Sequence, residues 1–255
     1  MKFTFPKDVA YKDDIATLNI IAAVAKQGWK RPLYFDGGLP GDNYIGLGDY
    51  MKLEGVVYRL LPYKKNDSVK TPQGGDIGSV NLDKSYDLFM NKYIWGGADR
   101  NDVYFDEKNR IMFAAYRLNS ARIANELTAV GRKADAVKLL DKVVNGITER
   151  SYFYDYIVYY MAAAYYNAGD MKGAHNLTSK LVRNSEDDIN WITTLSDSRK
   201  DGEAQDAQRD LAIINMLGNT AQSAGDTTTA RDLNKKLQML LQKVGPLVNR
   251  GQQQQ

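Results

Sequence analysis

The chain contains no cysteine and only one histidine, His175, among its 255 residues. Disulfide bonds, catalysis by a thiolate, cysteine-based zinc sites and metal sites built from several histidines are therefore excluded. The lack of cysteine does not fix the cellular compartment, because a chain without thiols suits oxidising and reducing surroundings equally.

The sequence also lacks a long apolar run. Its longest candidate, IVYYMAAAYY at 157–166, is about half of the roughly 20 residues that a membrane-spanning helix needs. Near the N-terminus, Pro6, Asp8 and Asp14 interrupt the place where a secretion signal has its apolar core. We therefore expect neither a spanning helix nor an export signal in the chain as written.

An excess of one charge is missing as well, since 34 basic residues stand against 31 acidic ones and the net charge is +3. The basic residues are scattered along the chain, which argues against a nucleic-acid partner and against a polybasic membrane patch. With 44% hydrophobic and 25% charged residues, the composition is that of a globular protein with one large domain or two small ones.

No catalytic or nucleotide-binding motif is present. Met51 follows Gly46 and Gly48 where a dinucleotide fingerprint needs glycine, and no phosphate-binding loop occurs. His175 has no serine or aspartate partner at the spacing of a catalytic set. Neighbouring carboxylates occur as Asp13/Asp14, Asp49/Glu54 and Asp187/Asp188. No sequence feature indicates that either member of a pair faces the other across a cleft as acid and base. We predict no catalytic residue, no metal ligand and no cofactor.

Proline and glycine divide the chain into two parts. Five of the six prolines lie within residues 1–72, and 12 of the 21 glycines lie within the first 100. We predict a small α+β subdomain over residues 1–105 and a long helical remainder. The expected elements of the subdomain are a helix from Asp13 or Asp14 to about Lys26, stopped by Gly28, strands at 31–36 and 56–64, an irregular loop at 64–81 and a helix from Leu82 to Gly96.

The helical remainder, 106–245, contains an internal repeat. A glycine is followed five residues later by an alanine three times, and a small residue precedes each glycine by seven; these sets are Ala124/Gly131/Ala136, Ala162/Gly169/Ala174 and Gly218/Gly225/Ala230. The pattern is similar to tetratricopeptide repeats, in which small residues let two helices approach and the glycine opens the turn. The fold class predicted is mainly α, with three tetratricopeptide-like hairpins at about 109–145, 152–183 and 206–243. An insertion is expected at 184–205 and a tail at 246–255, of which GQQQQ is expected to be disordered.

The stretch SYFYDYIVYYMAAAYY holds seven of the 17 tyrosines. At helical spacing, Tyr152, Tyr156, Tyr159, Ala163 and Tyr166 share one face, which by the repeat pattern lines a concave groove. The matching groove positions on the other hairpins are Asn125, Thr128, Asn215, Asn219 and Gln222. Tyrosines with amide side chains suit recognition of a peptide or a sugar. The alternative is that these tyrosines pack in the core or against the N-terminal subdomain, which would fill the groove.

GWKRPLYFD, residues 28–36, is unusual for a plain strand. As a binding surface it would offer Trp29 for stacking and Arg31 for an anion or a carboxylate. The alternative is structural: Trp29 packs under the first helix, Arg31 pairs with a nearby carboxylate, and Tyr34 belongs to the core.

Four landmarks over residues 10–185 resemble a known arrangement: LNIIAAVAKQGWKRPLYF, YIGLGDYMKLEGVVYRLLP, NKYIWGG and DVYFDEKNRIMFAAYRLNSARIANEL. They resemble the C-terminal soluble region of a bacterial family of multi-pass membrane proteins of unknown function, likened to protein mannosyltransferases of the GT-C glycosyltransferase class. The resemblance implies that catalysis belongs to a membrane bundle absent from this chain, so no catalytic residue is carried over. It also implies a periplasmic location, as part of a larger membrane protein.

The leading functional hypothesis is a non-catalytic accessory domain that binds an acceptor polypeptide or a partner protein. A free-standing, peptide-binding tetratricopeptide adaptor is the first alternative. The second is a carbohydrate-binding module with Tyr156, Tyr159 and Tyr166 as its platform, and an enzyme in its own right is the third. Contact with a membrane is expected only through the missing N-terminal part.

Overall fold

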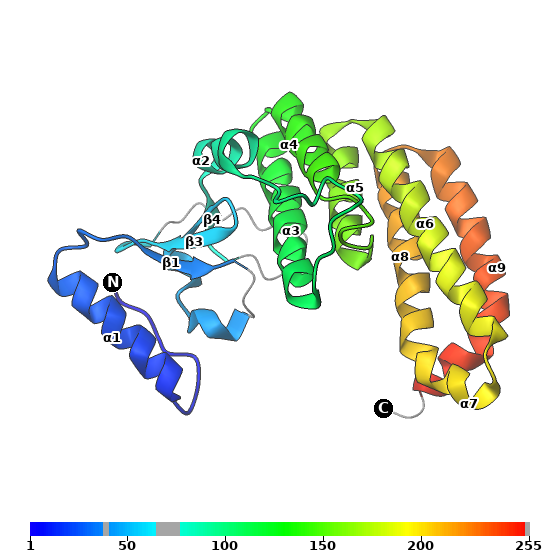
Figure 1. Ribbon diagram of the computed structural model, residues 1–255, viewed down its shortest axis with the longest axis horizontal. Coiled ribbons are helices and arrows are strands. Elements are labelled where there is room, and N and C mark those ends of the chain that lie inside the picture. The colour runs from blue at the N-terminus through cyan, green and yellow to red at the C-terminus, as the bar shows by residue number, and fades with distance from the viewer. Residues whose placement is uncertain (38–40, 65–76, 253–255) are drawn as a thin grey trace.

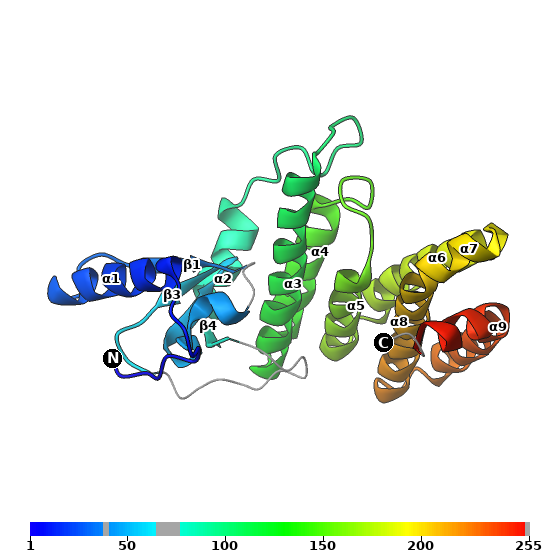
Figure 2. The same ribbon diagram turned by 90° about the horizontal axis from the view of Figure 1, so that it is seen from below.

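The computed structural model describes residues 1–37, 41–64 and 77–252 (Figure 1). The chain is mainly helical with one small sheet in its N-terminal part, which confirms the predicted class of fold. Figure 2 shows an elongated molecule, with the N-terminal helix and the sheet at one end and the last helices at the other.

The N-terminal part consists of short elements: α1 (Lys12–Lys26), β1 (Leu33–Asp36), β2 (Met51–Glu54), β3 (Val57–Leu60), β4 (Ser79–Val80), α2 (Leu82–Asp87) and a π-helical turn at Leu88–Lys92. The remainder is built from longer helices: α3 (Glu107–Ala129), α4 (Lys133–Gly146), α5 (Tyr156–Ala168), α6 (Met171–Thr194), α7 (Asp197–Lys200), α8 (Ala204–Ser223) and α9 (Thr227–Gln252).

The four strands form one sheet in the order β1-β3-β2-β4. Strand β3 pairs antiparallel with both β1 and β2, and β4 pairs parallel to β2. The predicted strands correspond to β1 and β3, whereas β2 lies in a stretch that was assigned no strand and β4 lies in the expected loop at 64–81. Most of that loop is outside the described residues. The β2–β3 turn depends on Gly55, which has a φ of +71° and touches the Tyr93 hydroxyl, so a Cβ would lie 2.0 Å from that oxygen.

A buried carboxylate ties the sheet to α2. Glu54 is 2% exposed, and its oxygens accept hydrogen bonds from Lys84 Nζ at 2.5 Å and from the Tyr34 hydroxyl at 3.0 Å. Asn81 Nδ2 donates to the same carboxylate at 3.2 Å. Burial alone raises the pKa of Glu54, but the hydrogen bonds from Lys84, Asn81 and Tyr34 outweigh it and hold that pKa below its usual value.

Helix α1 confirms the expected helix and its stop. Asp14 supports its first turn by accepting a hydrogen bond from the Tyr11 N–H, and Gly28 follows its end with a φ of +68°. In β1, Leu33 and Phe35 pack against the core whereas Tyr34 is 44% exposed. The placement of Tyr34 in the core was therefore wrong, because successive side chains of a strand point to opposite faces.

The helices from α3 onward form three neighbouring pairs: α3 with α4, α5 with α6, and α8 with α9 (Figure 1). The turn glycines Gly131, Gly169 and Gly225 have φ values of +84°, +85° and +82°, which glycine adopts at little cost. The small residues on both sides of each turn are buried, so they let the paired helices approach closely.

Residues 184–205 are not an inserted loop. Helix α6 continues to Thr194 and α8 begins at Ala204, with only α7 and a 3₁₀ turn between them. No proline or glycine interrupts 184–194, and Ile189 and Ile192 are buried, so packing prolongs the helix. The predicted tail is likewise wrong over 246–252, because α9 passes through Pro246 to Gln252 and buries Leu247. Residues 253–255 lie outside the described part.

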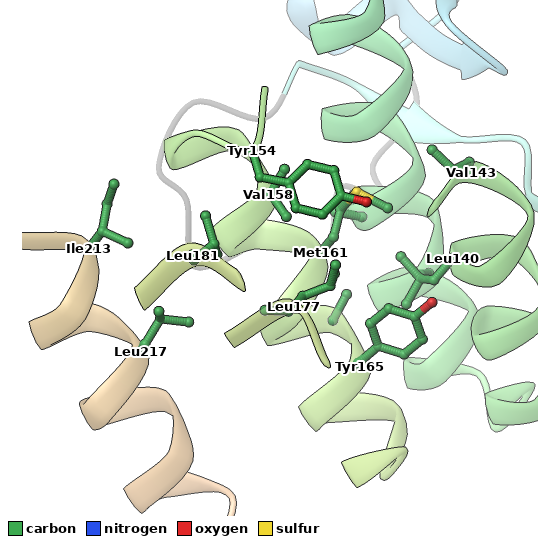
Figure 3. Packing of buried hydrophobic residues seen from close by; sticks show 14 of the residues in the cluster. Leu140, Val143, Tyr154, Val158, Met161, Tyr165, Leu177, Leu181, Ile213 and Leu217 are labelled. Atoms are coloured by element: carbon green, nitrogen blue, oxygen red, sulfur yellow. The ribbon is translucent and has the colours of Figure 1, made fainter. Parts of the chain in front are cut away.

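One hydrophobic cluster runs through all three pairs (Figure 3). Helix α5 is at its centre and contributes Val158, Met161 and Tyr165, each at most 2% exposed. They meet side chains of the neighbouring helices; Figure 3 labels Leu140, Val143, Leu177, Leu181, Ile213 and Leu217 among them. Burial of one such side chain is worth about 1.5–3 kcal/mol. Within the described residues, no helix combines the length and the apolarity needed to cross a bilayer.

Candidate functional site

A groove of about 840 Å³ lies among α3, α5 and α8. None of its lining residues is charged. Helix α5 contributes Tyr156, Tyr159, Tyr160, Ala163, Tyr166 and Asn167, and α3 contributes Asn125. Helix α8 and the residue after it contribute Met216, Asn219, Thr220, Ser223 and Ala224. The structure therefore brings together six of the ten positions predicted for the groove: Asn125, Tyr156, Tyr159, Ala163, Tyr166 and Asn219.

Three tyrosines form an aromatic cluster in this groove. The rings of Tyr156 and Tyr159 lie 6.4 Å apart at 20°, close to parallel. Tyr160 packs edge-on against both, with centroids 5.2 Å from Tyr156 and 5.3 Å from Tyr159. The cluster is partly open, since Tyr156 is 38% exposed. Such rings offer a large, rigid contact surface that loses little conformational entropy on binding.

Hydrogen bonds connect the helices across the groove. The Tyr159 hydroxyl lies 3.1 Å from Thr220 Oγ1 of α8, and Asn167 Nδ2 donates to Asn125 Oδ1 of α3 at 2.9 Å. The Tyr166 hydroxyl donates to Asp226 Oδ2, just beyond α8, at 3.3 Å. These contacts hold α5 at a fixed distance from both neighbours, so the groove is formed before any ligand arrives.

The hydroxyls of Tyr160 and Tyr166 stay neutral at physiological pH. Burial raises the pKa of Tyr160, and the hydrogen bond with Tyr156 raises it further. Burial also raises the pKa of Tyr166, helped by the negative charge of Asp226. The groove thus presents aromatic faces, hydroxyls and amides without charge, which suits an uncharged polar ligand.

The alternative in which the N-terminal subdomain fills the groove is wrong, because none of the described lining residues of the groove belongs to that subdomain. The turn of Leu88–Lys92 packs on α4, and α2 packs on α3, whereas α5 is in contact with α3, α4, α6 and α8. Three tyrosines of this stretch do belong to the core, as the alternative required; Tyr154, Tyr165 and Tyr166 are at most 4% exposed.

Four predicted positions lie elsewhere. Thr128 of α3 is not among the lining residues. Asn215 is exposed and is not among the lining residues. Gln222 lines another hollow together with Thr227 and Arg231. Tyr152 precedes α5 and stacks on a buried arginine, Arg117, at 4.9 Å.

Sequence reasoning also missed Tyr160, Asn167, Met216 and Thr220 of the groove. Tyr160 follows Tyr156 by four residues, so the i, i+4 spacing was the signal that could have found it. On α8, Asn219 was predicted correctly, but Asn215 and Gln222 are each one residue away from a lining residue, and one residue turns a side chain by about 100° around a helix.

Trp29 and Arg31 do not join the groove. Trp29 packs against the core and has a φ of +59°, an unusual value for a bulky residue. Arg31 is exposed, and in the described part of the chain it has no carboxylate partner within 4 Å, so the expected ion pair is not formed.

His175 has a partner that sequence spacing did not indicate. Its Nε2 atom lies 2.5 Å from Asp226 Oδ2, and the Thr229 hydroxyl is 3.5 Å away. Because His175 is on α6 and Asp226 is in the turn between α8 and α9, the pair joins two neighbouring hairpins. Across the described ranges, no three His, Cys, Asp or Glu side chains are grouped in a way that could hold a metal ion.

Fold and site together define a helical-hairpin protein with an uncharged, tyrosine-lined groove. In a comparison with protein families, residues 1–84 match the model of TMEM260-associated domain 2, a family linked to a membrane protein. The match covers α1, the sheet and the start of α2, and the groove lies outside it. No curated protein and no solved structure matches the chain.

Proposed function

We propose that this chain is a non-catalytic interaction module that holds an uncharged, extended stretch of polypeptide in the tyrosine groove. The observation that carries the proposal is the preformed groove of about 840 Å³ with no charged lining residue. Peptide bonds offer donors and acceptors at regular intervals, which the hydroxyl and amide groups of the groove can pair with. The similarity of the helix pairs to tetratricopeptide hairpins supports the same use of a concave face.

In this proposal the module is an accessory part of a larger, glycosyltransferase-like membrane protein, and it binds an acceptor polypeptide or a partner on the periplasmic side. Two observations support that setting. Residues 1–84 match a domain family linked to a membrane protein. The landmarks between residues 10 and 185 resemble the soluble region of bacterial mannosyltransferase-like proteins.

The test is a peptide-display selection against the immobilised full chain with a random twelve-residue library. Tyr159→Ala removes one ring of the aromatic cluster, so we expect the selected peptides to bind at least about tenfold more weakly. Because Tyr159 is half-buried and its hydroxyl bonds only across the groove, a chemical melt should show a loss well below the about 3–5 kcal/mol typical of a fully buried aromatic.

Tyr104→Ala is the matched control, since this tyrosine is 81% exposed and far along the chain from the groove. Equal binding by wild type and Tyr159→Ala would refute the groove as the site. Transfer or hydrolysis of a sugar by the isolated chain would refute the non-catalytic assignment.

The near-parallel rings of Tyr156 and Tyr159 support a second candidate, binding of a glycan. Sugar rings stack on such faces through their C–H groups. A glycan array decides between the two candidates: a hit that Tyr159→Ala abolishes favours the carbohydrate-binding module, and an empty array favours the polypeptide.

A further inference from the structure

A second, smaller cavity of about 380 Å³ lies next to the tyrosine groove, between the start of α5 and the facing sides of α6 and α8. Tyr156 lines both cavities, so the two adjoin at this residue. The smaller cavity differs in charge. Three carboxylates line it, Asp155, Asp188 and Asp210, against a single cationic residue, Arg209.

Asp210 is the most unusual group in this cavity. It is 3% exposed, and its Oδ2 atom has no hydrogen-bond partner in the described part of the chain. A buried carboxylate oxygen without a donor costs free energy in a folded protein. The cost is recovered when a ligand supplies the donor.

The nearby side chains are already engaged. The Arg209 guanidinium donates to Asp206 at 2.5 Å, on its own helix, and does not satisfy Asp210. Asp155 caps α5 by accepting from the Ile157 N–H, and it also accepts from the Tyr152 hydroxyl. A cation that pairs with Asp210 therefore has to come from a ligand.

We infer that this acidic cavity receives the cationic end of an arginine or lysine side chain from the polypeptide that lies in the tyrosine groove. The inference rests on the proposed function and narrows it, because it adds one basic residue to an otherwise uncharged segment. Tyr156 at the junction, 38% exposed, and Phe153 at the rim, 52% exposed, offer aromatic faces on which a guanidinium or ammonium group packs favourably.

An organic cation fits this cavity better than a metal ion. In the described chain, no three acidic or imidazole side chains converge as metal ligands, and calcium takes six to eight oxygens. A guanidinium group needs only planar acceptors and an aromatic neighbour, and both are present.

Binding of the cation should depend on pH. Burial raises the pKa of Asp210 to about 6; Ser185 and Arg209 lower it, while Asp188 and Asp206 raise it. Asp155 is the remaining charged group that lines the cavity, at the start of α5. Since only the ionised carboxylate attracts a cation, affinity should be full near pH 7.5 and fall as the pH drops through 6.

The experiment is a titration of the ¹⁵N-labelled full chain, followed by amide chemical shifts, with N-acetyl-arginine methylamide as the probe. We expect saturable shifts of the backbone amides of Phe153, Tyr154 and Ile157 at pH 7.5. Asp210→Asn should weaken the binding about tenfold, because it removes a charge-assisted hydrogen bond. This variant should fold, since it replaces a buried carboxylate, one oxygen of which has no partner among the described residues, by a neutral amide.

Two controls isolate the effect. Asp232→Asn changes the net charge equally, but Asp232 is exposed on α9, so binding should be unchanged. N-acetyl-norleucine methylamide has an aliphatic chain without the cation and should cause no saturable shift. The inference is overturned by an absence of shifts, by equal shifts with norleucine, or by equal affinity in Asp210→Asn.

A second measurement separates this inference from the proposed function. Random peptides with one fixed arginine are compared with peptides that carry norleucine at that position. Preference for arginine that Asp210→Asn abolishes supports the inference. If Tyr159→Ala binds neither library, the result supports the tyrosine groove as the polypeptide site but says nothing for the cation site. If the wild type binds both libraries equally, the inference is overturned and the proposed groove function stands. If no peptide binds in the groove but N-acetyl-arginine methylamide still binds, the cation site stands and only the polypeptide is refuted as its source.

Discussion

At the scale of single residues, Arg117 has the most demanding environment in the described chain. Its side chain is 1% exposed, and no carboxylate is hydrogen-bonded to it. The guanidinium donates instead to four backbone carbonyls in the α4–α5 connection, those of Ile147, Thr148, Tyr152 and Phe153, at 3.2, 3.5, 2.7 and 3.0 Å. The rings of Tyr152 and Tyr154 lie 4.9 and 4.7 Å from it. The connection is thus folded around one cation, and it leads directly into α5 and its tyrosines.

Arg117→Leu is expected to lower the free energy of unfolding by about 3 kcal/mol or more, because the backbone carbonyls of the α4–α5 connection lose their buried donor. Burial lowers the pKa of Arg117 only to about 10, so the side chain remains charged at neutral pH and the loss should be the same from pH 6 to 8. Urea unfolding of wild type and variant measures it.

Arg117→Lys is the informative companion variant. It keeps the charge but offers a compact ammonium group in place of a planar fork, so it should recover only part of the stability. Stability equal to wild type in either variant would contradict the role given to this side chain.

At the scale of elements, the close approach of paired helices depends on small residues at equivalent positions. Gly218 of α8 stands where the other pairs have Ala124 and Ala162, both fully buried. A Cβ added at Gly218 would meet Leu233 Cβ and Asn234 Oδ1 at 3.6 Å, an ordinary contact distance. The space between α8 and α9 therefore has room for the methyl group that the other pairs carry.

Gly218→Ala should raise the free energy of unfolding by about 0.5–1 kcal/mol, because alanine loses less backbone entropy in a helix. Gly146→Ala is the matched opposite, since its Cβ would lie 2.3 Å from the Trp95 ring and should cost about 1–3 kcal/mol. Thermal unfolding of the two variants separates backbone entropy from packing, and the same sign of change in both would contradict the argument.

At the scale of the whole molecule, the architecture separates two surfaces. The part that matches TMEM260-associated domain 2 occupies one end of the elongated chain, and the tyrosine groove lies among the helix pairs toward the other (Figures 1 and 2). In the proposed function the first part would face the remainder of a membrane protein while the groove stays free for a polypeptide.

That arrangement predicts the size and location of the native product. An antibody against this chain should detect a band well above 28.6 kDa in the membrane fraction of the source cells. A single band near 28.6 kDa in the soluble fraction would contradict the accessory assignment and favour the free-standing adaptor.

Local features of the fold could be predicted because they depend on neighbours in sequence. Gly131, Gly169 and Gly225 indicated the three turns, and each has the positive φ that glycine tolerates best. The missed strand β2 shows the limit of that reasoning. Its four residues become a strand only by pairing with β3 and β4, and β4 is more than 20 residues away in sequence.

The sequence predicted the types of residue in the candidate site, but not the full set of residues that line it. The sequence by itself determined that tyrosines of α5 share a face, since their spacing follows the helical period. Only the tertiary structure decided that α8 presents Met216 and Thr220 rather than Asn215 and Gln222, because the rotation of a helix about its axis is set by packing with its neighbours. The same packing buries Asp210 beside Asp188 and Asp155, residues from three separate segments of the chain, and so creates a charged cavity that no spacing in the sequence indicates.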